Sequence, residues 1–167
     1  AIALRNARIL QTLRDETRRD TYARIEAEKR LQSLKRYADL FASSADGIAV
    51  FDSDWRLLFA NPGAFRILDQ DEGERLGKRI WRMVPHDERR HVIGFARRIQ
   101  KGDFPRNVDV RFKRKDNSTV VISGSFSPLS GTEGAVLLSF RDVTDERKTQ
   151  DELVHTRNFL QSLIDAS

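Results

Sequence analysis

Apolar positions along the first part of the chain follow a helical rhythm. Residues 1–42 contain no proline and no glycine, and good helix formers dominate them. Apolar residues recur there in steps of four and three, which is the spacing of a coiled-coil seam. The expected seam consists of Ala27, Leu31, Leu34, Ala38 and Phe41. Because this polar helix has no core of its own, we expect it to pack against its copy in a dimer. Folding back onto its own domain is the alternative.

Short strands and turns follow this helix. The turn-forming residues 43–47 end it, and the apolar runs 48–51 and 55–60 predict the two strands of a hairpin. Asn61 and Pro62 are preferred as the cap and the first residue of a helix. A helix is therefore expected to begin directly after the hairpin.

A longer amphipathic helix and three strands complete the central part. The helix is expected from Asp87 to Gly102, with its apolar residues on one face. Alternating apolar and polar residues predict strands near 108–113, 120–126 and 136–140. This order predicts an α+β domain, in which a five-stranded antiparallel sheet carries helices on one face. The other face is also partly apolar, and the N-terminal helix is its expected cover.

The last segment predicts another helix, so the chain divides into three parts. Thr144 is the expected cap of this helix, and acidic residues fill its first turn, where the helix dipole favours them. We expect an N-terminal helix at 1–36, a central domain at 37–144 and a linker helix at 145–167. Both flanking helices are expected to form coiled coils.

Charge and composition narrow the possible functions. The 167 residues include 30 basic and 25 acidic side chains, a surplus of five, and residues 1–36 alone carry a surplus of the same size. These basic residues form no single stripe, so we expect them to pair with acids one helical turn away rather than to bind nucleic acid. No apolar run reaches the ~20 residues of a membrane span. The absence of cysteine excludes disulfides, cysteine-ligated metals and thiol photochemistry.

Four short motifs lie in and beside the central domain. They are LFASSADGI at 40–48, NPGAF at 61–65, RKDNS at 114–118 and RDVTDERK at 141–148. Together they resemble the PAS domain, the sensory module of bacterial signalling proteins, over residues 37–148. Asn117 stands where that family usually has glycine, in a turn that needs a positive φ, which asparagine tolerates.

The flanks carry further resemblances. Residues 1–14 resemble the last helix of a GAF domain, and residues 24–41 resemble the signalling helix that joins sensory modules. Residues 153–167 resemble the first helix of another PAS domain. As a whole, the resemblance implies a cytoplasmic sensor histidine kinase of the GAF–PAS type, a member of a two-component system.

Within such a protein, this part of the chain is expected to be a sensory, relay and dimerisation module with no catalysis of its own. Its expected partners are a second copy, bound through the flanking helices, and neighbouring domains of the same chain. No membrane or nucleic-acid contact is expected of it. The alternatives are a haem- or small-ligand-binding gas or redox sensor, a regulatory module of a diguanylate cyclase, and a basic nucleic-acid-binding module.

The RDVTDERK motif carries the strongest candidate site. In the PAS family the junction Asp142-Val143-Thr144 couples the last strand to the output helix. Asp142 is expected to pair with Arg147 or with a basic residue of the first helix. A salt bridge at such a joint can have two arrangements, as a switch requires. A plain structural helix cap is the other interpretation.

A ligand pocket is the second candidate site. Its expected walls are Phe65, Ile80, Trp81, His91, Phe95, Ile99, Ile122 and Phe140. Such apolar pockets bind small molecules, although the same side chains also serve as an ordinary core.

No cofactor and no metal are expected in this pocket. Haem is the alternative, because haem-binding PAS domains of rhizobial kinases carry their iron ligand in the helix that holds His91. Two features count against haem. His91 lies one residue off the apolar face, and the segment from Gly102 to Asp116 is shorter than in those sensors.

Overall fold

The computed structural model describes residues 1–167 as two compact units, Ala1–Phe41 and Ala42–Ser167. The first unit is formed by α1 (Ile2–Ser43), a single helix in which no residue is buried. Its charges pair at the expected spacing, as in Arg24–Glu28 at 3.7 Å. The long N-terminal helix is confirmed and ends in the predicted turn, while its coiled-coil pairing stays a prediction.

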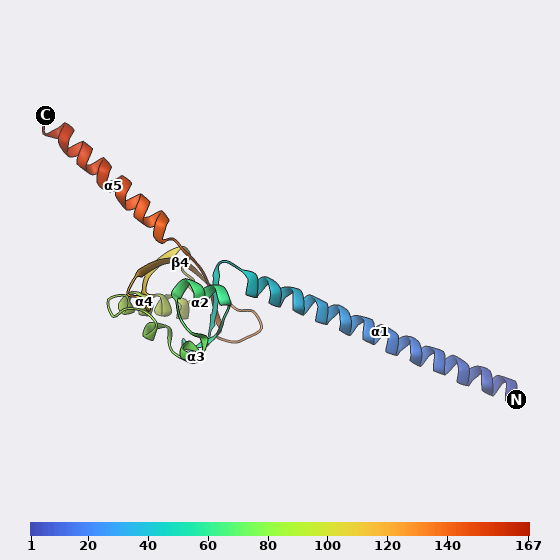
Figure 1. Cartoon of the computed structure of the whole chain (residues 1–167). Helices are drawn as coiled ribbons and strands as arrows, with labels where there is room; N and C mark the ends of the chain where they lie inside the picture. The colour runs from blue at the N-terminus through green and yellow to red at the C-terminus, as the bar shows by residue number, and fades with distance from the viewer. The chain divides into compact units, whose positions relative to one another are not determined.

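The second unit is the α+β domain that the sequence predicts (Figure 1). Its elements are β1 (Gly47–Phe51), β2 (Leu57–Ala60), α2 (Pro62–Leu68), α3 (Glu72–Arg75), the 3-10 helix η1 (Ile80–Arg82), α4 (Arg89–Gln100), β3 (Val108–Lys113), β4 (Thr119–Pro128), β5 (Val136–Asp142) and α5 (Thr144–Asp165). The strands form one antiparallel sheet in the order β2-β1-β5-β4-β3. The predicted fold class is therefore confirmed.

The β1–β2 hairpin is shorter than predicted because Trp55 belongs to its turn. Trp55 has a φ of 64°, a left-handed conformation that ends extended structure, so β2 begins at Leu57 rather than at residue 55. The Asp52 carboxylate holds this turn by accepting the N–H groups of Asp54 and Arg56, both at 2.9 Å. The indole of Trp55 is buried in the core.

The start of α2 is fixed by a fully buried side chain. Asn61 Oδ1 accepts the N–H of Ala64, which caps the helix as predicted, and also that of Ile48 in β1, both at 2.9 Å. Asn61 Nδ2 donates to the carbonyl of Asp46 at 3.0 Å. Gly63 is required beside it, because a Cβ there would lie 2.6 Å from a backbone oxygen of the preceding loop. These contacts bind the α2 start to the hairpin.

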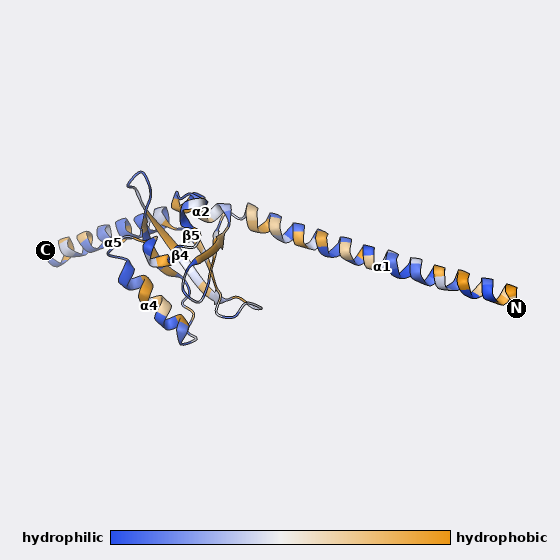
Figure 2. Ribbon diagram, turned by 90° about the horizontal axis from the view of Figure 1, so that it is seen from below, coloured by the Kyte–Doolittle hydropathy of each residue, from blue (hydrophilic) through white to orange (hydrophobic).

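The core fills the space between the inner sheet face and helices α2 to α4. Along β4, Val120, Ile122 and Phe126 are buried and alternate with half-buried Ser123 and Ser125. The apolar face of α4 is buried as predicted, through Val92, Phe95, Ala96 and Ile99. Figure 2 shows the apolar residues gathered in the strands and recurring along α1 and α5. The sheet domain thus has its own continuous core.

The outer sheet face carries apolar side chains that remain partly open. Phe59 is 53% exposed, and its cross-strand neighbour Val50 lies opposite Leu137, which is half-buried. Cover of this face by the N-terminal helix stays a prediction. None of the helices combines the length and the apolar character that crossing a bilayer requires.

Candidate functional site

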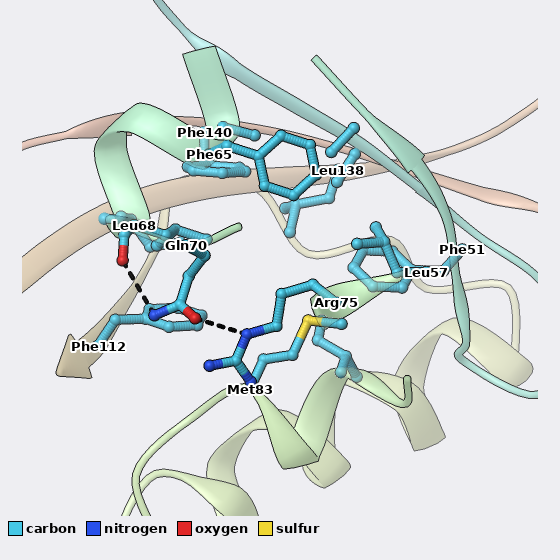
Figure 3. Close-up of a pocket in the computed structure, with 15 residues that line it drawn as sticks. Phe51, Leu57, Phe65, Leu68, Gln70, Arg75, Met83, Phe112, Leu138 and Phe140 are labelled. Carbon is cyan, nitrogen blue, oxygen red and sulfur yellow. Dashed lines mark hydrogen bonds between the residues drawn. The ribbon is translucent and has the colours of Figure 1, made fainter. Parts of the chain in front are cut away.

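A small apolar cavity lies between the inner sheet face and the segment from α2 to η1 (Figure 3). Its volume is about 40 Å³. The apolar lining residues are Ala49, Phe51, Leu57, Ala60, Ala64, Phe65, Leu68, Ile80, Met83, Phe112, Ile122, Leu138 and Phe140. Two polar side chains complete the wall, Gln70 and Arg75. An apolar chamber with a few polar groups is the usual form of a small-molecule site.

The two polar residues form a hydrogen-bonded pair that we call the cavity mouth. Arg75 Nε donates to Gln70 Oε1 at 2.5 Å, and Gln70 Nε2 donates to the carbonyl of Leu68 at 3.2 Å (Figure 3). Both side chains are half-buried. The cavity mouth therefore connects the last turn of α2 with α3 through the half-buried, polar part of the cavity wall.

The structure distributes the expected pocket residues over several places. Phe65, Ile80, Ile122 and Phe140 line the first cavity. Phe95 lines a second cavity of about 20 Å³, which shares Ile80 and Ile122 with the first. Ile99 borders a more open pocket of about 380 Å³ beside the β4–β5 hairpin, and Trp81 and His91 line none of these three.

His91 lies at the surface, where it does not fit the role of a haem ligand. Its side chain is 54% exposed, and Nδ1 is 3.5 Å from Glu88 Oε2. Glu88 is buried and accepts a hydrogen bond from Arg111 Nε at 2.7 Å. The interior cavities of about 40 and 20 Å³ are also far smaller than the ~300–1,000 Å³ of sites for larger ligands. The residues present thus form a surface ion cluster rather than a haem pocket.

The junction between β5 and α5 is a compact hydrogen-bonded cluster. Asp142 Oδ1 accepts the backbone N–H of Thr144 at 2.9 Å and its hydroxyl at 2.5 Å. The Thr144 hydroxyl oxygen accepts the N–H of Val121 in β4 at 3.0 Å. Thr144 is therefore not the helix cap that the sequence suggests. It ties the first turn of α5 to β4, while the Asp142 carboxylate receives the free N–H.

Asp142 pairs with Arg114 rather than with Arg147. Arg114 Nη2 donates to Asp142 Oδ2 at 2.9 Å, and Arg114 Nε donates to the carbonyl of Ile67 in α2 at 3.1 Å. Asp142 lies opposite Ile122 in the β4–β5 register, so its side chain is directed toward the helix-covered side of the sheet. This register explains why the predicted pair with Arg147 is wrong.

Arg147 instead binds β3 from the first turns of α5. Its Nε and Nη2 donate to the two carboxylate oxygens of Asp109 at 2.6 and 3.2 Å. Asp109 lies opposite Ser123, which belongs to the outer sheet face. The two ion pairs of the junction thus connect to opposite faces of the sheet.

Both carboxyl groups of the junction have lowered pKa values. The hydrogen bond from Arg147 is the main cause for Asp109 and outweighs the effect of burial on its pKa. For Asp142, burial alone would raise the pKa, but the hydrogen bonds from Thr144 and the charge of Arg114 together lower it. Both groups are therefore held in the charged form that their partners require.

Sequence reasoning missed the residues that close the cavity and connect it to the junction. Gln70 and Arg75 lie in a segment without a hydrophobic repeat, and none of the four motifs includes them. Arg114 is the first residue of the RKDNS motif, but the motif predicts a turn and does not indicate the pairing of Arg114 with Asp142. The structure shows no group of three or more acidic or histidine side chains arranged to hold a metal ion.

Known proteins with similar sequences and folds agree with this architecture. Residues 41–148 match the family described as the PAS fold. The chain is 27% identical over 145 residues to the sensor histidine kinase TmoS of Ectopseudomonas mendocina, covering 80% of this chain and 15% of that protein.

Two solved structures illustrate the fold. A PAS domain from Colwellia psychrerythraea has a TM-score of 0.59 at 19% identity, covering 67% of this chain and 98% of that one. A domain of a sensory box sensor histidine kinase/response regulator from Geobacter sulfurreducens has a TM-score of 0.57 at 21% identity, covering 66% and 94%. With its five-stranded sheet, its inner cavity and the family match over most of its length, the chain belongs to the PAS-fold family.

Proposed function

We propose that this PAS domain is the sensory and relay module of a sensor histidine kinase, and that it works as a dimer through α1 and α5. It performs no chemistry. It converts a change at the inner cavity into a change in the packing of α5, and α5 passes that change to the next module. The observation that carries the proposal is the hydrogen-bonded connection from α2 to the start of α5.

That connection begins at the cavity and ends on α5. The last turn of α2 supplies Leu68 to the cavity wall, and its Leu68 carbonyl holds Gln70 of the mouth. The adjacent Ile67 carbonyl accepts from Arg114, whose other nitrogen binds Asp142. A shift of α2 therefore acts on the same carboxylate that holds the first turn of α5.

The exposed apolar residues of the two flanking helices support their proposed role in dimerisation. α1 and α5 bury no residue, yet apolar side chains recur along both of them. A helix of this kind gains stability by packing on a partner. Regulation through helix packing requires such a partner, and a second copy of the chain supplies one with matching apolar positions.

The relay is tested in the full-length kinase by removing the bridge at Arg114. Arg114→Gln should change the autophosphorylation rate about fivefold or more, because coupling energies between sites span about 1–3 kcal/mol. Arg114→Lys keeps the charge but not the two-pronged contact, so it should restore only part of the wild-type rate. Arg106→Gln, a change at an exposed arginine without a partner, is the matched control.

The circular dichroism melting curve of each variant separates relay from stability. The relay proposal requires that Arg114→Gln melts close to wild type while its output changes. An unchanged autophosphorylation rate in both Arg114→Gln and Asp142→Ala would show that the junction is only structural.

A further inference from the structure

The cavity mouth sets this cavity apart from a purely apolar void. We propose that the cavity takes a small molecule with an apolar body and one carboxylate, and that Arg75 binds the carboxylate. The inference names the ligand class of the sensory site and therefore rests on the proposed function. It is carried by the charge of Arg75, its partial burial in the cavity wall and its lack of an acidic partner.

Four arginines of the sheet domain are half-buried, and three of them have a partner for their charge. These partners are Asp142 for Arg114, Asp109 for Arg147, and the ring of Trp81 at 5.3 Å for Arg79. Arg75 has only the neutral amide of Gln70. Desolvating a cation without a counter-charge is unfavourable, so an anion supplied by a ligand would complete this site.

A carboxylate fits Arg75 better than a larger anion does. The planar guanidinium matches the two oxygens of a carboxylate, and only its Nε is engaged in the present structure. Arg75 is the single cation in the lining of the cavity. A phosphate dianion would keep an uncompensated charge there, whereas a monoanion is neutralised by one arginine.

The rest of the chamber suits a hydrocarbon. Phe51, Phe65, Met83 and Phe112 are among the apolar side chains that line it, and the end of the Arg75 side chain is directed toward Gln70 (Figure 3). The present volume of about 40 Å³ is well below the ~150 Å³ that accommodates benzene. A short or branched acid would gain room when the Gln70 side chain moves away from Arg75. The first cavity would gain further room by merging with the second cavity, since Ile80 lines both.

Ligand binding at this point would reach the relay directly. A carboxylate on Arg75 competes with Gln70 Oε1 for the guanidinium. The released amide is the group that holds the Leu68 carbonyl, next to the Ile67 carbonyl on which Arg114 rests. The anion therefore acts on the last turn of α2, where the connection to α5 begins.

The test measures binding to the 167-residue chain and does not involve kinase output. Isothermal titration with isovalerate and benzoate is compared with their uncharged amides, isovaleramide and benzamide. We expect at least one acid to bind with a millimolar or lower dissociation constant, and at least tenfold more tightly than its amide. Met83 is the only methionine and lines the cavity, so its labelled methyl resonance should shift during the titration.

Two arginine variants locate the anion. Arg75→Gln should lower the affinity for the acid at least tenfold and leave the affinity for the amide unchanged. Arg66→Gln, at an exposed arginine of α2 without a partner, should bind like wild type. Equal binding of acid and amide, unchanged binding in Arg75→Gln, or no binding of either acid at millimolar concentration would each overturn the inference.

This experiment and the autophosphorylation experiment fail independently. Acid binding with a Met83 shift, together with unchanged output in Arg114→Gln, would retain the ligand and reject the relay. Altered output in Arg114→Gln without acid binding would retain the relay and reject this ligand class.

Discussion

The apolar residues of the sheet domain are buried, whereas those of its flanking helices are exposed. In the domain, side chains that alternate along β4 and β5 are buried inside the same chain, and Val120 is fully enclosed. Along α1 and α5 the leucines recur with helical spacing but stay exposed, such as Leu31 at 55% and Leu153 at 66%. The domain therefore holds its own stability, whereas we expect the helices to gain theirs from a partner.

This difference supports the different tasks that we propose for the two regions. A region that is stabilised internally can detect a ligand without unfolding, and a region that needs a partner can change its packing. The cluster around Asp142 lies at the boundary between the sheet domain and α5.

Placing charges in the expected dimer seam of α1 should give the largest change in free energy, a loss of dimer association. Leu31→Asp combined with Leu34→Asp removes four buried leucines from a dimer, each worth about 1.5–3 kcal/mol, so association should weaken by roughly 6 kcal/mol or more. Sedimentation should change from about twice 19.2 kDa to 19.2 kDa at micromolar concentration. The unfolding free energy of the sheet domain should stay the same.

The control for this prediction adds the same charge outside the seam. Gln32→Asp combined with Ser33→Asp lies on the outer side of the same turn and should remain dimeric. A wild-type chain that sediments as a monomer at high concentration would reject dimerisation through α1.

Breaking the core of the domain should have the next largest effect. Ile122 is 2% exposed, and Ile122→Ala should lower the free energy of unfolding by about 2–5 kcal/mol. Leu163→Ala in α5 removes a side chain that is 54% exposed and has no contact with the core, so it should change the unfolding free energy of the sheet domain by less than about 0.5 kcal/mol. Urea denaturation followed by the fluorescence of Trp55 and Trp81, which both lie in the sheet domain, measures both changes. Similar losses in the two variants would remove the distinction between the regions.

Most of the fold could be predicted because its apolar positions repeat with short periods. Alternation along β4 and the helical spacing in α1 require only neighbouring residues to be read. The start of β2 could not be predicted in this way. It depends on the positive φ of Trp55, which the Asp52 carboxylate stabilises through hydrogen bonds that hydropathy does not encode.

The site depends more on contacts between distant residues than the fold does. The pairing of Asp142 with Arg114 follows from the register between two strands and from the end of α2, 47 residues before Arg114. The cavity mouth joins Gln70 to Arg75 in a segment without periodicity. Motif resemblance located the junction, but only the assembled sheet selected its ion pairs.

Removing the hydrogen bond that attaches α5 to the sheet should cause a moderate loss of stability. Thr144→Val keeps the shape of the side chain but leaves the Val121 N–H without its acceptor, which should lower stability by about 1–2 kcal/mol. Thr144→Ser keeps the hydroxyl and should recover most of this loss. Thr156→Val in the exposed part of α5 is the control and should change little. If Thr144→Val unfolds like wild type in thermal denaturation, the hydroxyl does not anchor the helix.

The smallest effect concerns the Asp109–Arg147 ion pair, and it should depend on pH. The pKa of Asp109 is lowered in the folded protein, chiefly by the hydrogen bond from Arg147. A carboxyl group with a lowered folded pKa stabilises the fold above its unfolded pKa of about 3.9, and this contribution disappears as the pH falls through the folded value. Because solvent screens this half-exposed pair, Asp109→Asn should lower the melting temperature by only about 2 °C at neutral pH.

The pH series separates this pair from a general charge effect. The difference in melting temperature between wild type and Asp109→Asn should be constant from about pH 7 to pH 5, and it should vanish as the pH falls through the lowered folded pKa of Asp109, where the wild-type carboxyl group becomes protonated. Asp54→Asn, at an exposed carboxylate without a side-chain partner, should show no such difference. A difference that persists at the lowest pH would mean that Asp109 acts through packing on the outer sheet face. In that case α5 would be held at the junction by the Asp142–Thr144 cluster alone.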